Sequence, residues 1–131
     1  MDKGDLSRIK HIKRYCEDIA DAVSRFGDSY EVFTNDIHYL NSVSMSIMQI
    51  GELSIGITDE FKEATRTQMQ WGLMRGMRNR FAHTYNEMEK DDIWETATKD
   101  IPALLSFCER VIEKSALESG KTAKRSDRDA R

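Results

Sequence analysis

The sequence predicts an all-α protein, an antiparallel bundle of four or five helices. Apolar residues recur at spacings of three and four along most of the chain, which is typical of helices that bury one face. Strict alternation of apolar and polar residues does not persist anywhere, so no strand is expected. The 131 residues, 39 % of them hydrophobic, are enough for one domain with its own core.

Composition narrows the class of protein. The chain has 20 Lys and Arg against 23 Asp and Glu, a formal net charge of −3, so overall charge gives no nucleic-acid signal. It contains no apolar run of about 18 residues, and its polar beginning lacks the apolar core of a secretory signal. We therefore expect a cytoplasmic protein without membrane partners. Cys16 and Cys108 lie far apart and are expected to be reduced core thiols.

The first helix is expected from Asp5 to Gly27. Asp5 can cap its beginning, and Gly27 suits its exit. Its apolar seam alternates spacings of three and four, as in helices that pack against another helix. The seam consists of Ile9, Ile12, Cys16, Ile19, Val23 and Phe26.

After a short connection over residues 28–33, Thr34 or Asn35 can open a second helix that runs to about Gly56. Its apolar residues lie on more than one side, which predicts a central helix. One stripe is Leu40, Val43, Ile47 and Ile50, and the other is Met45, Met48 and Ile55.

Residues 58–67 are polar and are expected to hold a turn or a short helix, followed by a third helix from about Gln68 to Tyr85. A fourth begins near Asp91 or Asp92, whose carboxylates suit a helix N-terminus. Pro102 lies inside its apolar pattern and should kink or divide it.

The apolar periodicity fades from Ser115. We therefore divide the chain into a helical bundle over residues 1–114 and a charged, disordered tail over residues 115–131. Residues 121–131 contain five basic and two acidic side chains, 5 − 2 = +3. Such a tail could contact a polyanion, although a frayed terminus is the favoured interpretation.

One segment departs from the acidic background. Between Ala64 and Asn86 there is no Asp or Glu, while four arginines and one histidine are present. At about 100° per residue, the third helix places arginines on one strip, Asn79 and His83 on the strip beside it, and apolar residues opposite, facing the core. The first strip holds Arg75, Arg78 and Tyr85, and the core side holds Met74, Met77 and Phe81.

These side chains suit cleavage of RNA without a metal. Arginine offers a fork of donors that matches phosphate, and histidine transfers protons near neutral pH. The 2′-hydroxyl of RNA is an internal nucleophile, so the protein needs only proton transfer and charge stabilisation. Arg78 and His83 diverge by about 140° on one helix, so they could converge if the helix ended early or if a second copy supplied the complementary group. The same cluster could also be a solvated or interface face without chemistry.

The string Arg78-Asn79-Arg80-Phe81-Ala82-His83-Thr84-Tyr85 resembles the RN-x-x-x-H-x-Y signature of HepT-like ribonuclease toxins of the HEPN superfamily. The resemblance extends from about Leu6 to Ile112. Its other elements are Ile50-Gly51-Glu52, Trp71, Gly76-Met77, Ile93-Trp94-Glu95 and the run from Asp100-Ile101-Pro102 to Leu104.

The resemblance implies a HEPN-like bundle that forms a homodimer, with the motif helices lining a shared cleft. It implies a metal-independent endoribonuclease that needs no cofactor and acts as the toxin of a toxin–antitoxin pair. The implied partner is a minimal nucleotidyltransferase that adds AMP to Tyr85 and silences the nuclease. By the same resemblance His83 transfers protons, Arg78 binds or stabilises phosphate, and Asn79 supports the site.

Three further residues are candidates for the site. Glu52 could orient Arg78 or Arg75 as a carboxylate behind them, or could form a purely structural salt bridge. Arg75 and Arg80 could contact the RNA backbone or be solvated. Two other functions remain open: a non-catalytic module that binds RNA or nucleotide or docks a nucleotidyltransferase, and a plain dimerisation bundle.

The remaining chemistry-bearing residues favour structural roles. His11 is expected at the surface, and His38 lies near Tyr39 at the beginning of the second helix. No metal site is predicted, because the spacing of Asp36 and His38 alone is common. Gly72 and Gly76, four residues apart, are expected to permit a close helix contact.

Overall fold

A computed structural model describes the backbone of residues 1–84 and 90–129, and the side chains of residues 1–79 and 90–120. Within these ranges every regular element is helical, which confirms the all-α class. The long helices are α1 (Lys3–Phe26), α3 (Ile37–Ile55), α5 (Trp71–Thr84) and α7 (Ile101–Asp129). The short elements are α2 (Tyr30–Asn35), α4 (Asp59–Ala64), α6 (Lys90–Glu95) and the π-helical turn η2 (Thr96–Asp100).

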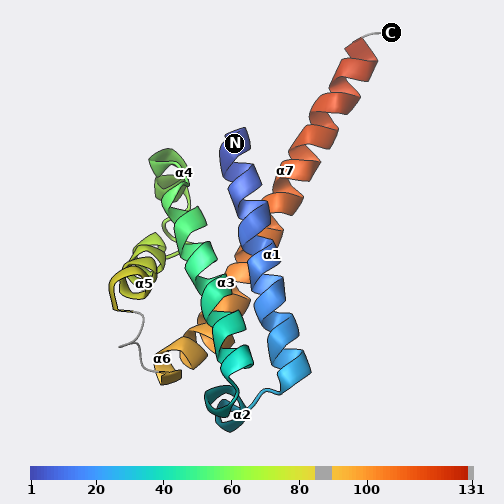
Figure 1. The fold of residues 1–131 in the computed structure, drawn as a ribbon. Coiled ribbons are helices and arrows are strands. Elements are labelled where there is room, and N and C mark those ends of the chain that lie inside the picture. Colours follow the sequence, from blue (N-terminus) through green and yellow to red (C-terminus); the bar gives the residue numbers. More distant parts are fainter. Residues whose placement is uncertain (85–89, 130–131) are drawn as a thin grey trace.

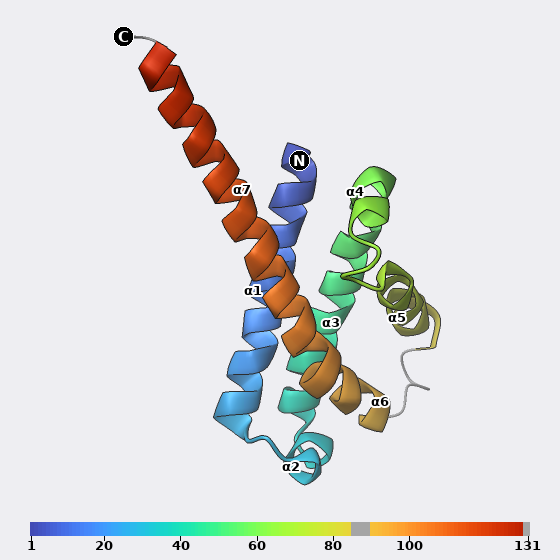
Figure 2. The same ribbon diagram turned by 180° about the vertical axis from the view of Figure 1, so that it is seen from behind.

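Helices α1, α3 and α7 form the body of the bundle. Figures 1 and 2 show α3 and α7 running antiparallel to α1 and packed along it. Helix α5 packs against α3 on the side away from α1. The predicted site helix is therefore an outer layer whose main neighbour is α3.

The apolar seam of α1 is confirmed over its first four members, Ile9, Ile12, Cys16 and Ile19, all buried. The seam then drifts, because 3.6 residues per turn do not match a strict alternation of three and four. Ala22 is buried, Val23 is only partly buried, and Phe26 is exposed. Gly27 ends the helix with a φ of 111°, as predicted from its freedom to adopt positive φ.

Asp5 does not cap α1, so that prediction was wrong. Asp2 is the cap, and its side chain accepts from the backbone N–H of Asp5 at 3.1 Å. The buried carboxylate of Asp5 instead accepts from Thr58 N–H at 2.9 Å and from the Thr58 hydroxyl at 2.6 Å. This long-range contact ties α1 to the beginning of α4, which sequence spacing alone does not reveal.

The connection after α1 is not irregular, because it contains the short helix α2. Ser29 caps this helix. Phe33 of α2 is buried, with its ring centroid 5.1 Å from that of Tyr39 and 5.0 Å from that of Trp94. Asp36, not Thr34 or Asn35, caps α3.

Helix α3 is central on one side and open on the other. Its first predicted stripe is buried at Val43, Ile47 and Ile50 and partly buried at Leu40. The second stripe is largely open, because Met45 is 54 % exposed and Ile55 is exposed as well. Some apolar side chains of α3 therefore remain exposed on the surface of the protomer.

A turn or a short helix was expected over residues 58–67, and the structure has the short helix α4 there. Helix α5 begins at Trp71, three residues later than expected. The Trp71 indole N–H donates to the Thr65 hydroxyl at 3.0 Å, and its ring packs on Phe61 and Phe107. These contacts hold the entrance of α5.

The fourth predicted helix is divided before Pro102, as expected. Asp91 and Asp92 lie in the first turn of α6, and the π-helical turn η2 separates α6 from α7. The Ile101 N–H donates to the Thr96 carbonyl, five residues earlier. Proline lacks an N–H, and the wider turn accommodates the interruption.

Helix α7 continues beyond residue 114 to Asp129 and projects past the bundle (Figure 1). This differs from the disordered tail that the fading periodicity predicted. Good helix formers such as Ala, Leu, Glu and Lys recur in this stretch, and they extend a helix that is already nucleated. The division of the chain at residue 114 stays a prediction.

Candidate active site

The candidate site is built where α5 crosses α3 at Gly51. A Cβ placed on Gly51 would lie 2.7 Å from the Cβ and 3.2 Å from the Cα of Arg78. Real Cβ atoms do not approach that closely, so the crossing requires a residue without a side chain. Gly51 thereby brings the backbone of Arg78 directly onto α3.

The next residue of α3, Glu52, receives the Arg78 side chain. Arg78 Nε donates to Glu52 Oε1 at 2.7 Å, and Arg78 Nη1 donates to Asn79 Oδ1 at 3.2 Å. Of the two partners that the sequence left open for Glu52, the structure selects Arg78.

The ion pair is at the surface, with the Arg78 side chain 32 % exposed and the Glu52 side chain 50 % exposed. Exposed ion pairs contribute only about 0–1 kcal/mol to stability. Its main consequence is geometric, because a guanidinium held at two nitrogens presents its remaining donors in a fixed direction.

The other described residues of α5 divide between two sides, as the helical wheel predicts. Met74 is buried, Met77 is half-buried, and Arg75 is exposed one turn before Asn79. Arg80 and His83 lie in α5, but their side chains are outside the described set, as is that of Phe81. Tyr85 lies outside the described residues altogether.

The backbone of α5 stays helical through Thr84, so the helix does not end between Arg78 and His83. Five residues at about 100° each place the two positions about 140° apart around the axis. Of the two ways in which they could meet, an early helix end is therefore excluded for this chain. The second, a contribution from another copy, remains.

Sequence spacing did not reveal the role of Gly51 in positioning Arg78. Gly51 belongs to one of the elements that carry the family resemblance, whereas the close helix contacts were expected at Gly72 and Gly76. A glycine beside a lone glutamate in an otherwise apolar helix is the signal that could have marked the crossing.

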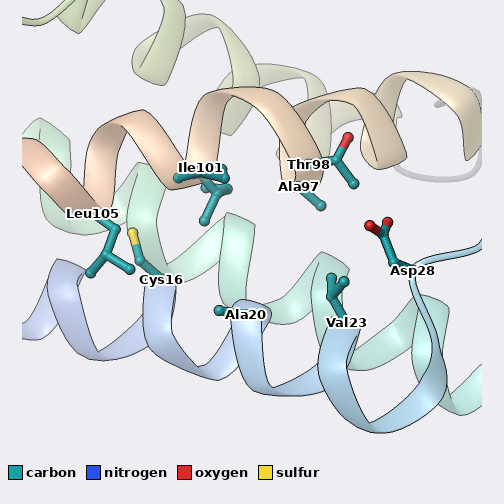
Figure 3. A pocket seen from close by; sticks show the side chains of 9 residues that line it. Cys16, Ala20, Val23, Asp28, Ala97, Thr98, Ile101 and Leu105 are labelled. Atoms are coloured by element: carbon teal, nitrogen blue, oxygen red, sulfur yellow. The ribbon is translucent and has the colours of Figure 1, made fainter.

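A cavity of about 260 Å³ lies elsewhere, between α1 and the η2–α7 segment (Figure 3). Its walls are mostly apolar, with Asp28 and Thr98 at one end and Cys16 farther along. Cys16 and Cys108 are free and fully buried, which confirms them as core thiols. Burial raises the pKa of Cys108 to about 12 and also raises that of Cys16, so neither is a ready nucleophile.

His11 is exposed, as predicted, and His38 is exposed as well. His11 Nδ1 lies 2.7 Å from the Ser7 carbonyl, a local contact within α1. Among the described side chains, no three of His, Cys, Asp and Glu gather where they could hold a metal ion. No helix in the described ranges is long and apolar enough to cross a membrane.

Comparison with known proteins gives two matches. The family described as "Ribonuclease HepT-like" matches residues 10–111. A protein named "Putative RNase TTE0752", from Caldanaerobacter subterraneus subsp. tengcongensis, is 30 % identical over 106 residues, which cover 81 % of this chain and 92 % of that protein. No solved structure matches the chain.

Proposed function

The chain belongs to the HepT-like ribonuclease family, and from this premise we propose that it is a metal-independent endoribonuclease acting in the cytoplasm. Its all-α bundle is of the HEPN-like class that the resemblance implied. The observation that carries the proposal is the Glu52–Arg78–Asn79 contact, which holds the Arg78 guanidinium in one orientation. Arg78 itself lies in a segment of the sequence without acidic residues.

Arg78 binds the scissile phosphate and stabilises the charge that develops on it. A guanidinium has five N–H donors, and the contacts with Glu52 and Asn79 use one on Nε and one on Nη1. The others are available to phosphate oxygens, because the Arg78 side chain is part-exposed. Arg75 and Arg80 add positive charge along the same helix for the RNA backbone.

His83 transfers protons in the cleavage step. The 2′-oxygen of the ribose attacks the adjacent phosphorus and loses its proton to a base, while the bond from phosphorus to the 5′-oxygen breaks and that oxygen gains a proton. The products are a 2′,3′-cyclic phosphate and a 5′-hydroxyl, so neither a water nucleophile nor a metal-activated one is needed for cleavage.

A homodimer completes the site. Because α5 is continuous, Arg78 and His83 of one protomer diverge, and a two-fold partner can supply the complementary residue. The exposed face of α3 supports this arrangement, since Met45 and Glu52 are seven residues apart and fall on the same side of the helix. An interface over this face would bury Met45 beside the site.

We further propose that the nuclease is the toxin of a toxin–antitoxin pair, silenced by a cognate minimal nucleotidyltransferase that adds AMP to Tyr85. On the helical wheel expected from the sequence, Tyr85 shares the strip of Arg75 and Arg78, so an AMP group attached there would add negative charge and bulk beside these arginines. Both effects oppose the binding of another phosphate.

Cleavage of RNA by the purified, unmodified chain in the presence of EDTA tests the nuclease. We expect cleavage by the wild type and a loss of at least about tenfold in His83→Ala and in Arg78→Ala. Arg66→Ala is the matched control, because Arg66 is an exposed arginine whose partner is Glu63, at 3.2 Å. Intact RNA with the wild type would count against the nuclease, and binding without cleavage that weakens with salt would favour the non-catalytic module.

Mass spectrometry after co-expression with the proposed cognate nucleotidyltransferase tests the silencing step. AMP additions should map to Tyr85 and disappear in Tyr85→Phe. Tyr30→Phe is the control, since Tyr30 is an exposed tyrosine in α2, outside α5. Modification that persists in Tyr85→Phe would show that the tyrosine assignment is wrong.

A further inference from the structure

The cavity of about 260 Å³ between α1 and the η2–α7 segment lies apart from the candidate active site (Figure 3). No residue of α3 or α5 lines it, so it contains neither Glu52 nor Arg78. Cys16, which is fully buried, lies at its inner end, and Asp28, which is exposed, lies at its outer end. The apolar residues that line it are Ala20, Val23, Ala97, Ile101, Pro102 and Leu105.

Asp28 brings a carboxylate to the outer end of this cavity. Figure 3 shows the carboxylate pointing from the loop after α1 toward η2. The cations close to it in the chain or across the cavity are engaged elsewhere, because Arg25 Nε lies 3.4 Å from Asp21 and Lys99 Nζ lies 3.5 Å from Glu95. Within the described part of the chain, Asp28 forms neither a hydrogen bond nor an ion pair through its side chain. Its negative charge is therefore available to a ligand.

The η2 side of the outer end offers further hydrogen-bond acceptors. The Thr98 hydroxyl donates its proton to the Trp94 carbonyl at 2.8 Å, so toward a ligand its oxygen can only accept. The Thr98 carbonyl also lacks its usual α-helical donor, because position 102 is Pro102, which has no N–H. Both residues line the cavity. A π-helical turn inserted between helices is frequent at functional sites, and here it shapes one wall of the cavity.

We propose that this cavity binds a small organic cation, a primary ammonium group on a short apolar body. An ammonium group has three donors and no acceptor, so it matches the carboxylate of Asp28 and the oxygens of Thr98. The apolar body fills the space between α1 and α7 toward Cys16. At about 30 Å³ for each water-sized group, the cavity has room for about nine non-hydrogen atoms.

The position of the charge favours a free amine over a lysine side chain of another protein. A lysine side chain would enter with its ammonium group first and carry the charge toward Cys16, among apolar walls where an unpaired charge is strongly penalised. A free amine can enter with its apolar end first and leave its ammonium group at Asp28. The acceptors at the outer end and the apolar inner end therefore fit a small free amine.

An NMR titration of the isotope-labelled full chain with phenethylammonium, which has about nine non-hydrogen atoms, tests the proposal. We expect saturable shifts of the backbone amides of Cys16, Ala20 and Thr98, with a Kd of about 1 mM or below. The neutral analogue 2-phenylethanol has the same apolar body, and it should bind at least about tenfold more weakly because it carries no charge.

Two variants locate the ligand. Asp28→Asn should weaken the binding of phenethylammonium at least about tenfold, whereas Asp18→Asn, at an exposed aspartate of α1 outside the cavity, should not. Ala20→Phe fills the cavity and should abolish binding, with Ala116→Phe on the exposed side of α7 as its matched control. All four positions are exposed, so the variants should fold, which circular dichroism verifies.

Three results would overturn the proposal. The first is the absence of saturable shifts, and the second is equal binding of phenethylammonium and 2-phenylethanol or equal loss in the cavity and control variants. The third is tighter binding of Nα-acetyl-lysine methylamide than of phenethylammonium, which would assign the cavity to a lysine side chain of another protein. None of these readouts depends on RNA cleavage, so they stand apart from the proposed nuclease.

Discussion

The two faces of α5 differ in how closely other atoms approach them, and glycines show the difference. On the face toward α3, the partner glycine Gly51 lets the backbone of Arg78 approach so closely that no Cβ would fit. On the outer face, Gly72 and Gly76 meet no described atom at all. The first face is committed within the protomer, and the second is open in the part of the protomer that the structure describes. A glycine in a helix therefore indicates close approach only where the structure supplies the approaching backbone.

The largest effect is expected on the committed face. Gly51→Ala forces a Cβ against the Cα and Cβ of Arg78, so α3 and α5 must move apart. Such overpacking costs about 1–3 kcal/mol. Unfolding by urea measures this loss, and RNA cleavage should fall with it because Arg78 is displaced from Glu52. A variant as stable and as active as the wild type would show that the crossing is looser than described.

The second prediction separates positioning from stability on the same face. Glu52→Gln keeps an acceptor for Arg78 but removes the charge that holds it. Cleavage should fall about tenfold, the scale of an orienting group behind a site, while the free energy of unfolding changes by less than about 1 kcal/mol because the pair is exposed.

Glu63→Gln is the matched control for this second prediction, since it removes the charge from the exposed Arg66–Glu63 pair. Single-turnover cleavage at saturating RNA is the measurement for both variants. Equal rates for Glu52→Gln and Glu63→Gln would reduce the Glu52–Arg78 pair to a structural contact.

The smallest effect is expected on the open face. Gly76→Ala adds a methyl group where no described atom stands nearby and removes a flexible residue from a helix interior. It should raise the free energy of unfolding by about 0.5–1 kcal/mol. Thermal denaturation at low protein concentration measures it. A loss of stability that grows with protein concentration would indicate instead that another chain packs on this face.

Local patterns in the sequence predicted much of the fold. The Ile9, Ile12, Cys16 and Ile19 seam, the exit at Gly27 and the division before Pro102 all follow from apolar periodicity and from the backbone properties of glycine and proline. The same patterns failed at Asp5, whose carboxylate bonds to Thr58, 53 residues away. Capping is a local rule, and it does not reveal that a distant element competes for the same carboxylate.

In the candidate site, too, some features follow from local sequence patterns and others depend on distant contacts. The basic segment and the assignment of Met74 and Met77 to the other side of α5 follow from helical geometry alone. The choice of Arg78 over Arg75 as the partner of Glu52 does not, because the two arginines lie on one strip and either could face α3. The crossing at Gly51 decided it by fixing the rotation of α5.

The sequence by itself determined an all-helical chain of the HepT-like family, its core seam and its positively charged segment, because helix period, charge and a short motif are properties of neighbouring residues. Tertiary structure alone decided that Gly51 admits the backbone of Arg78, that Arg78 is the arginine bonded to Glu52, and that Gly72 and Gly76 meet no described atom. These outcomes depend on the distance and rotation between two helices, which emerge only when the whole core packs.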